Sequence, residues 1–200
     1  DSRAADIITG WNDCNLHAQV FPYTIQSFWP AQPNALLVWL KQNEPQNYER
    51  LGAILMIKDY IKYRLTGEIS TDYTDMSATS LMDIRNQCYS RELMALYDLS
   101  EAYDALPPLK RSSEICGQVT PAVAAETGLA IGTPVVGGLF DVDASAIGAG
   151  TINVNQACLV MGSWSINEVI TKDPIVDPSL FMTTLFAEPG LYLTIEGSAT

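Results

Sequence analysis

Apolar positions in the first part of the chain recur at the spacing of amphipathic helices. The segment YERLGAILMIKDYIKYRLTGE places leucine and isoleucine every three or four residues and ends at Gly67, a candidate C-terminal cap. A second apolar face precedes Pro45 and includes Trp39, which we expect in the core. Ser90 is a candidate N-cap for the segment RELMALYDL. The pattern predicts that residues 1–118 are mostly helical.

The pattern changes after Gly117. Thr120, Pro121 and Gly128 have the positions of an N-cap, a first helical residue and a C-terminal cap, and therefore predict a short helix. The run TPVVGGLF predicts a buried strand. Further short β-rich runs follow it: TINV, ACLVMGS, INEVIT, FMTTLF and LYLTIE. Helices first and strands later favour a mixed α and β domain over an alternating βαβ barrel.

Composition and charge narrow the possible partners. The chain has 200 residues, of which 48% are hydrophobic and 17% charged, as in a globular domain. Twenty-three acidic against eleven basic residues give a net charge of −12, which argues against nucleic acid or an anionic membrane as partner. No apolar run approaches the roughly 20 residues that a membrane-spanning helix needs.

The cysteines give no metal-binding pattern. Cys14, Cys88, Cys116 and Cys158 are widely spaced, and the single histidine is His17, so a zinc site is not expected. Such cysteines are typical of buried thiols in a reducing compartment, which favours a cytoplasmic protein. The chain opens on DSRAAD without a methionine, and we expect it to be a piece of a longer protein.

Two carboxylates interrupt the apolar run PVVGGLFDVDASAIGAG at a point with little side-chain bulk. Asp141 follows the predicted strand that ends at Phe140, and residues 144–150 can form a helix or a tight turn. Ligands of open α/β sheets gather where strands end and helices begin, and the field of a helix N-terminus keeps an aspartate ionised. Asp141 could therefore accept a proton or hold a magnesium-bound water. The alternative is that Asp141 or Asp143 is simply a helix N-cap.

A second candidate site lies in the run LVMGSWSINEV. A strand is predicted to end at Gly162 and to turn through Ser163. Backbone N–H groups and a hydroxyl in such a turn can hold a phosphate. An ordinary hairpin turn is the alternative.

These segments together resemble the FGGY family of carbohydrate kinases, which phosphorylate sugars and polyols with ATP. The resemblance runs through the whole chain, in order, and rests on DSRA, PAQPNALLVWLKQNEP, MIKDYIKYRLTGEISTDYTDMSAT, CGQVTPAVAAETGLAIGTPVVGGLFD and GSW. The chain departs from the family pattern at Leu36, where a lysine is usual, and at Trp164, where a small residue is usual.

The resemblance implies roles for five residues. Asp141 would be the general base that takes the proton of a sugar hydroxyl as its oxygen attacks the γ-phosphate. Asp1 and Arg3 would lie near the sugar, although Arg3 could equally be a structural ion-pair partner. Gly162 and Ser163 would contact the phosphates of ATP. ATP and Mg²⁺ are the implied cofactors, and a sugar or polyol is the implied substrate.

Other polar residues in these motifs are interpreted as structural. Asp143 is interpreted as a cap or a surface acid, and Asp72 and Asp75 as residues that fix a loop. Lys58 and Arg64 on the long predicted helix are expected to be solvated.

The implied architecture is the actin-like ATPase fold, with ribonuclease-H-like sheets and ATP between two domains. Residues 1–118 would be the mostly helical part of the first domain, and residues 119–200 its β-rich part with the catalytic aspartate and the phosphate loop. The opening strand pair and the second, adenine-binding domain would be absent. We therefore expect residues 1–200 alone to be inactive and to expose a sheet edge that favours association or low stability, and the full-length enzyme to be a homodimer.

The run GSWSINE resembles the L-xylulose kinase branch of the family most, so a pentulose is the first substrate to consider. Glycerol is less favoured, because glycerol kinases usually carry an aromatic residue where Ala31 stands. Two other functions are open. One is a non-catalytic actin-like module that binds a ligand or regulates. The other is a scaffold with an acidic metal site at Asp141 and Asp143.

Overall fold

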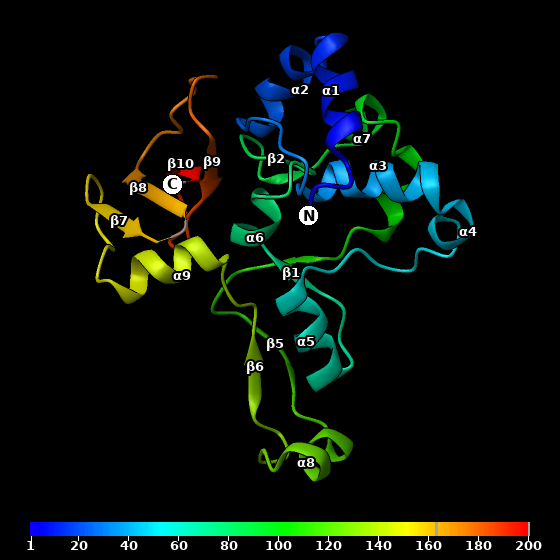
Figure 1. Ribbon diagram of the computed structural model, residues 1–200. Helices are drawn as coiled ribbons and strands as arrows, with labels where there is room; N and C mark the ends of the chain where they lie inside the picture. Colours follow the sequence, from blue (N-terminus) through cyan, green and yellow to red (C-terminus); the bar gives the residue numbers. More distant parts are fainter. Residues whose placement is uncertain (163, 200) are drawn as a thin grey trace.

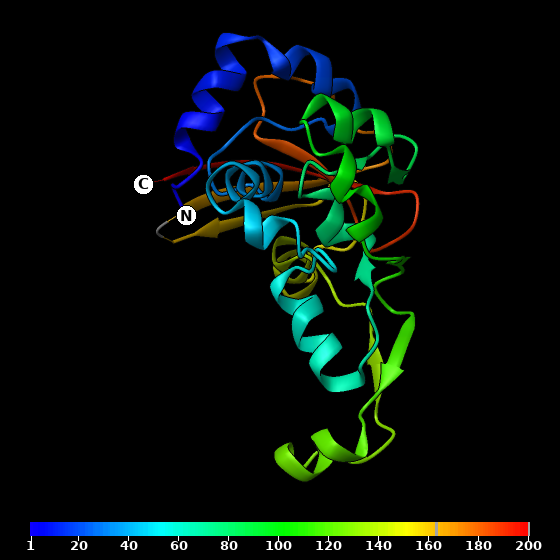
Figure 2. The same ribbon diagram turned by 90° about the vertical axis from the view of Figure 1, so that its right-hand side faces the viewer.

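The computed structural model describes residues 1–162 and 164–199 and has three parts. A group of helices and a four-stranded sheet form the upper half of the molecule, and an elongated arm extends away from both (Figures 1 and 2). We use "the arm" for α5 (Ile57–Thr66) together with the hairpin of β5 (Ile115–Gln118), α8 (Pro121–Thr127) and β6 (Pro134–Val136). The arrangement is mixed α and β, as the sequence predicts.

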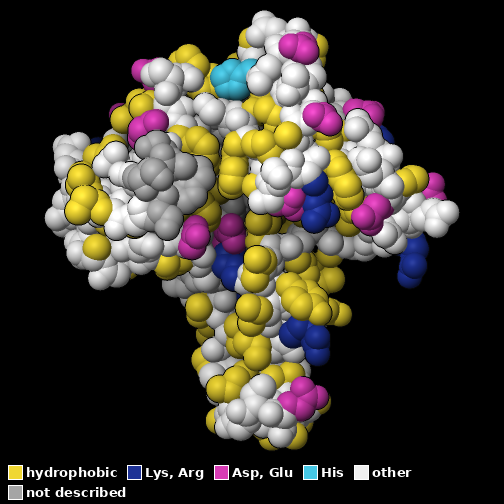
Figure 3. Space-filling model, viewed as in Figure 1, with side chains coloured by type: hydrophobic (Ala, Val, Ile, Leu, Met, Phe, Trp, Pro, Cys, Tyr) yellow, Lys and Arg dark blue, Asp and Glu magenta, His cyan; other side chains and the backbone are white. Residues whose placement is uncertain are grey.

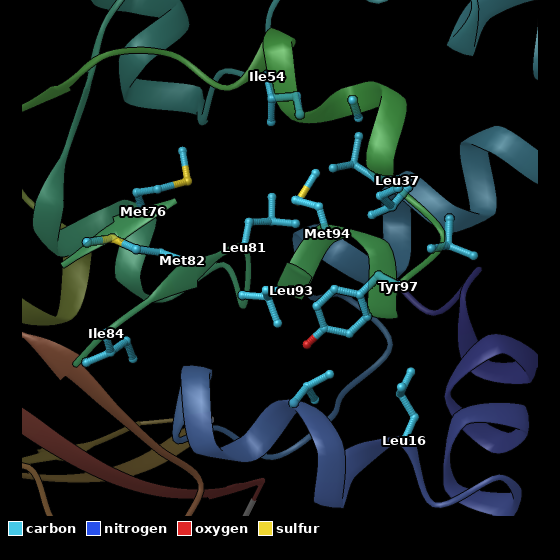
Figure 4. Packing of buried hydrophobic residues seen from close by; sticks show 14 of the residues in the cluster. Leu16, Leu37, Ile54, Met76, Leu81, Met82, Ile84, Leu93, Met94 and Tyr97 are labelled. Carbon is cyan, nitrogen blue, oxygen red and sulfur yellow. The ribbon is translucent and has the colours of Figure 1, made fainter. Parts of the chain in front are cut away.

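The helical part surrounds a hydrophobic core in which the side chains of Leu81, Leu93, Met94 and Tyr97 are almost completely buried (Figure 4). Ser90 caps α7 as predicted, since its Oγ accepts a hydrogen bond from the Leu93 N–H at 3.2 Å. The elements of this part are α1 (Ala5–Asp13), α2 (Leu16–Thr24), α3 (Pro33–Asn43), α4 (Pro45–Tyr48), β2 (Met82–Asp83), β3 (Cys88–Tyr89), α7 (Arg91–Leu96) and the 3-10 helix η1 (Ser100–Ala105).

The four-stranded sheet is antiparallel, in the order β7, β8, β10, β9. Its strands are β7 (Ala157–Met161), β8 (Trp164–Thr171), β9 (Met182–Leu185) and β10 (Tyr192–Ala199). Helix α9 (Asp141–Gly148) lies along the sheet and buries Ala146 in one apolar cluster with Ile170 and Leu193 (Figure 1). The outer side of β9 meets the helical part, where the Thr183 N–H donates to the Ile25 carbonyl at 3.0 Å. Strand β7 forms the other edge of the sheet.

The arm begins at a short parallel pair, β1 (Thr71–Asp72) with β4 (Leu109–Lys110), next to the five-residue helix α6 (Tyr73–Ser77). Helix α5 (Ile57–Thr66) lies beside the antiparallel pair β5 (Ile115–Gln118) and β6 (Pro134–Val136), which α8 (Pro121–Thr127) connects. The predicted caps are confirmed: Gly67 and Gly128 end their helices with φ of 79° and 78°.

The structure corrects three expectations about elements. The long helix starts only at Ile57, because residues 51–56 run without helical bonds and the Ile54 N–H donates to the Ala105 carbonyl instead. The run TINV is a turn, not a strand. The run TPVVGGLF gives three strand residues on an exposed hairpin, with Val136 45% exposed, so it is no buried strand.

Two further expectations concern single side chains. Only Cys158 among the four cysteines is buried, and Cys14 and Cys88 are exposed free thiols. Trp39 is half-buried at the margin of a small cluster and contacts the Arg3 guanidinium, so it is not a central core residue. No helix within the described ranges is long and apolar enough to cross a membrane.

Candidate active site

Asp141 is the first residue of α9 and lines a cavity of about 430 Å³ between this helix and the sheet. Residues 137–140, which lead into the helix, belong to no strand. The N-cap residue is Phe140, whose side chain cannot cap, so neither Asp141 nor Asp143 is the N-cap. The carboxylate of Asp141 is exposed at the helix end where backbone N–H groups favour negative charge. Phe140, Ile166, Phe181 and Ile195 form apolar parts of the cavity wall.

Asp1 lines the same cavity as Asp141, although 140 positions separate them in sequence. Arg3 lines an adjoining cavity of about 460 Å³, which Asp1 also borders. Arg3 Nε lies 2.9 Å from Asp1 Oδ2, and its guanidinium carbon lies 4.8 Å from the centre of the Trp39 ring. The structure thus brings Asp1 and Asp141 together and holds Arg3 beside Asp1 as an ion-pair partner.

Gly162 lies in the turn of the hairpin formed by β7 and β8, where Met161 pairs with Ser165. The backbone at Gly162 is exposed. Ser163, the other predicted phosphate-binding residue, lies outside the described residues, as does the side chain of Trp164. The geometry is that of a hairpin turn, and contact of this turn with phosphate stays a prediction.

Asp143 is completely buried, so its interpretation as a cap or a surface acid is wrong. Its Oδ1 accepts a hydrogen bond from the Ala187 N–H at 3.1 Å. Burial, and then the charge of Asp72, raises the pKa of Asp143 to about 8. Asp143 and Ala146 are three residues apart and both lie on the buried face of α9, whereas Asp141 is exposed.

Glu168 on β8 is a second buried acid in this region, with 1% of its surface exposed. Burial, and then the charge of Asp141, raises the pKa of Glu168 to about 7. The cavity therefore has an exposed carboxylate at Asp141. Asp143 and Glu168 are acids of the same region whose burial favours their protonated forms. From the sequence, Asp143 was noted beside Asp141 without a prediction of its burial, and Glu168 was not identified.

Lys58 is paired with three carboxylates and its side chain is only 25% exposed, so the expectation of a solvated lysine is wrong. Its Nζ lies 2.7 Å from Asp59 Oδ1, 2.7 Å from Asp72 Oδ1 and 3.3 Å from Asp75 Oδ2. Burial opposes the charge of Lys58, but the attraction of Asp72 and Asp75 outweighs it and raises the pKa above its usual value. Lys58 and Asp75 also line a small cavity of about 330 Å³ that Asp141 borders. The positive charge of Lys58 is thus neutralised by three carboxylates and does not favour an anionic ligand.

The residues around Lys58 form a compact ionic cluster, which we define as Lys58, Asp59, Lys62, Asp72 and Asp75. Burial raises the pKa of Asp75 to about 6, although the charge of Lys58 acts against this shift. Lys62 Nζ lies 3.1 Å from Asp59 Oδ1 and donates to the Gly137 carbonyl at 3.3 Å. Arg64 on the same helix is exposed, as expected. The sequence signal for the cluster is the spacing of Lys58 and Lys62, one helical turn apart on the buried side of α5.

The magnesium ion that the resemblance implies would need oxygen donors at this cavity. No group of three metal-binding side chains that could form a cage occurs within residues 1–162 and 164–199. Asp141 offers one accessible carboxylate at the cavity. Mg²⁺ usually binds through one or two carboxylates together with substrate phosphates and water, so this donor set fits a magnesium ion that arrives with a nucleotide.

Residues 1–148 match the family model of the FGGY family of carbohydrate kinases, N-terminal domain. The chain is 37% identical to a probable L-xylulose kinase of Pasteurella multocida, over 100% of the chain and 42% of that protein. It is 38% identical to the L-xylulose/3-keto-L-gulonate kinase of Escherichia coli, over 86% of the chain and 34% of that protein. The chain thus spans less than half the length of these relatives.

Solved structures show the same likeness. A xylulose kinase from Rhodospirillum rubrum superposes with a TM-score of 0.90 at 27% identity, covering 100% of this chain and 41% of that one. A glycerol kinase from Plasmodium falciparum, determined with ADP, superposes with a TM-score of 0.89 at 18% identity, with the same coverage of each chain. The second likeness concerns the fold alone.

Proposed function

The chain belongs to the FGGY family of carbohydrate kinases and has the actin-like ATPase fold, and from this premise we propose that its protein phosphorylates a sugar hydroxyl with ATP. A pentulose, with L-xylulose first, is the proposed substrate, because relatives at 37% and 38% identity are named for L-xylulose. The single observation that supports catalysis by this part of the protein is the exposed carboxylate of Asp141, at the start of α9 and on the wall of a cavity.

In the proposed mechanism Asp141 accepts the proton of the attacking sugar hydroxyl. An ordinary aspartate suffices as base, because the transition state of phosphoryl transfer is loose and depends mainly on positioning and charge neutralisation. The carboxylate of Asp141 lies at the first turn of α9, on the wall of the cavity where the sugar hydroxyl is proposed to bind. ATP supplies the phosphoryl group, and Mg²⁺ neutralises charge on its phosphates.

The cavity at Asp141 has the character of a sugar site. Its apolar wall suits the C–H face of a sugar, and the carboxylates of Asp1 and Asp141 suit hydroxyl groups. We place Asp1 at the sugar and Arg3 behind it, where their ion pair fixes the orientation of the Asp1 carboxylate. Gly162 and Ser163 are proposed to contact nucleotide phosphates.

The test is a screen of the full-length protein against pentuloses, hexuloses, polyols and aldonates, with ADP release as the readout. We expect sugar-dependent turnover, and we expect Asp141→Asn to lower kcat by about 10²–10⁴-fold, the usual contribution of a positioned general base. Asp13→Asn, at an exposed position at the end of α1, is the matched control and should retain activity.

A non-catalytic ligand-binding or regulatory module gives a different pattern. Such a protein would bind a sugar or nucleotide without turnover, and Asp141→Asn would change its binding only slightly. Circular dichroism on each variant separates a loss of chemistry from a loss of fold. Turnover by Asp141→Asn at the level of the Asp13→Asn control would refute Asp141 as the base.

A further inference from the structure

The segment Gly137–Phe140 delivers Asp141 to the cavity but has no helix or strand of its own. Its first half is attached to the base of the arm, since the N–H groups of Gly137 and Gly138 donate to the carbonyls of Glu114 and Ser112, each at 3.0 Å. Its last residue is attached elsewhere. The Phe140 N–H donates to Thr74 Oγ1 on α6 at 2.8 Å, across 66 positions of sequence.

Both hydrogen-bonding functions of the Thr74 hydroxyl are used. Because an N–H group can only donate, Thr74 Oγ1 must accept from Phe140, and its own proton is directed to Asp72 Oδ2 at 2.5 Å. The side chain is 1% exposed, so water cannot replace either partner at low cost. The orientation of the hydroxyl is therefore fixed.

Asp72 is itself anchored on several sides. Its Oδ1 lies 2.7 Å from Lys58 Nζ, and its Oδ2 also accepts from the Thr74 N–H at 2.9 Å and from Ser112 Oγ at 3.1 Å. A continuous chain of contacts thus leads from the ionic cluster through Thr74 to the residue that immediately precedes Asp141. Phe140 does not cap α9 with its side chain, and the hydrogen bond from its N–H to Thr74 on α6 holds the backbone at the start of the helix.

We propose that Thr74 is a positioning residue for the Asp141 carboxylate. The proposal rests on the function proposed above, in which Asp141 is the base. Thr74 does not touch the substrate; it holds the backbone from which Asp141 projects. A misplacement of about 1 Å in a catalytic group can cost about 100-fold in rate, so loss of this one hydroxyl should reduce turnover while the residues that bind the sugar stay in place.

The experiment compares three variants of the full-length protein. Thr74→Val removes the hydroxyl at nearly constant volume, and Thr74→Ser retains it. Thr79→Val is the matched control, because Thr79 is equally buried and also donates and accepts, to the Met76 carbonyl and from the Leu81 N–H, with no contact to residues 137–141 among the hydrogen bonds of the described residues. The readouts are kcat and KM for the sugar, and amide hydrogen exchange of the peptide covering residues 137–141.

We expect Thr74→Val to lower kcat by about 10–100-fold with KM for the sugar within about threefold, and to speed exchange at residues 137–141. Thr74→Ser should restore kcat to within about threefold of the parent, and Thr79→Val should change neither kcat nor this exchange. Equal kcat in Thr74→Val and Thr79→Val, or unchanged exchange in Thr74→Val, overturns the proposal. Absence of phosphotransfer by the parent protein refutes the proposed function instead, and the exchange comparison then still decides whether Thr74 holds the segment.

Discussion

The carboxyl group of Asp143 lies in a buried environment that disfavours its ionised form. It is completely buried on the inner face of α9, and among the hydrogen bonds of the described residues it accepts only one, from the Ala187 N–H. The acids Asp72, Glu168 and Asp75 also act on it and favour its protonated form. The native protein therefore holds a proton at Asp143 near neutral pH, where an unfolded chain has already released it.

This proton makes stability depend on pH. The pKa of Asp143 is about 8 in the folded chain and about 4 in an unfolded one, so the native state binds more protons between these values. The contribution of Asp143 is fully present below about pH 4 and is lost as the pH rises through 8, by at most about 1.4 kcal/mol per pH unit. Asp143→Asn supplies an amide oxygen that can accept from the Ala187 N–H but does not titrate. This variant should therefore flatten the dependence of the free energy of unfolding on pH between pH 5 and pH 8.5.

Urea unfolding at a series of pH values measures this effect. Asp177→Asn is the control, because Asp177 is exposed and hydrogen bonds from Ser179 lower its pKa, so its titration is complete before pH 5. An unchanged slope in Asp143→Asn would contradict a raised pKa at this residue.

The sequence distinguished Asp141 from Asp143 only through the family resemblance. Burial of Asp143 depends on which face of α9 meets the sheet, and the short apolar pattern of Val142, Ala146 and Ile147 does not define that face clearly. The position of Asp1 could not be predicted from local sequence either. It lines one cavity with Asp141 and Gly197, which lie far from it in the chain. Motif order could suggest these residues, but only the packing brings them together.

At the scale of elements, the ionic cluster joins α5 to β1 and α6. The side chain of Lys58 is 25% exposed, and it faces three carboxylates of which two, Asp59 and Asp72, are completely buried. Removing a cation from such a group leaves buried negative charges that repel each other. Loss of one partner from a buried ion pair typically costs about 3–5 kcal/mol.

Lys58→Met should therefore lower the free energy of unfolding by about 3 kcal/mol or more, since Met keeps the aliphatic stem but not the charge. Arg64→Met, six residues further along the same helix, should stay within about 0.5 kcal/mol of the parent, because Arg64 is exposed. Thermal or urea unfolding of both variants provides the comparison. A Lys58→Met variant as stable as Arg64→Met would show that the cluster contributes little.

Local sequence patterns predicted the ends of helices well where a capping residue was present. They predicted the ends of elements poorly where contacts between distant segments determine them. The cap residues Gly67, Ser90 and Thr120 all act as predicted. The strand expected up to Phe140 ends at Val136, because the chain then turns closely past residue 111: a Cβ at Gly137 would lie 2.4 Å from the Arg111 carbonyl oxygen. The adjacent glycines Gly137 and Gly138 were the only sequence signal for this turn. They indicate a close backbone approach but do not identify residue 111 as the neighbour.

At the scale of the whole molecule, the order of the segments predicted a mixed α and β domain and the resemblance predicted the actin-like fold, whereas no local signal predicted the arm. The segments that form it, α5 and residues 115–136, are separated by the pair β1 and β4 and by the helices of the core. Hydrophobic side chains cover much of the visible surface of the arm (Figure 3). Ile57, Ile61 and Ile131 of the arm are 83%, 54% and 67% exposed. Exposed apolar surface of this kind usually marks a contact with other protein.

The sheet has a second exposed apolar surface at its outer strand. Leu159 and Met161 on β7 are 68% and 89% exposed, and β7 is the edge of the four-stranded sheet. An edge strand with apolar side chains and unpaired backbone groups can pair with the same edge of another chain. We therefore predict that residues 1–200, prepared alone, associate with increasing concentration.

Light scattering and sedimentation over a range of concentrations measure this association. Leu159→Lys with Met161→Lys should shift the equilibrium toward monomer, because charged side chains on an edge strand oppose pairing. Ile57→Lys with Ile131→Lys is the matched pair on the arm, and it distinguishes association through the arm from association through β7. If only the arm variant restores monomer, the arm is the contact surface and β7 is not. A parent chain that is monomeric at every concentration would contradict the prediction for both surfaces.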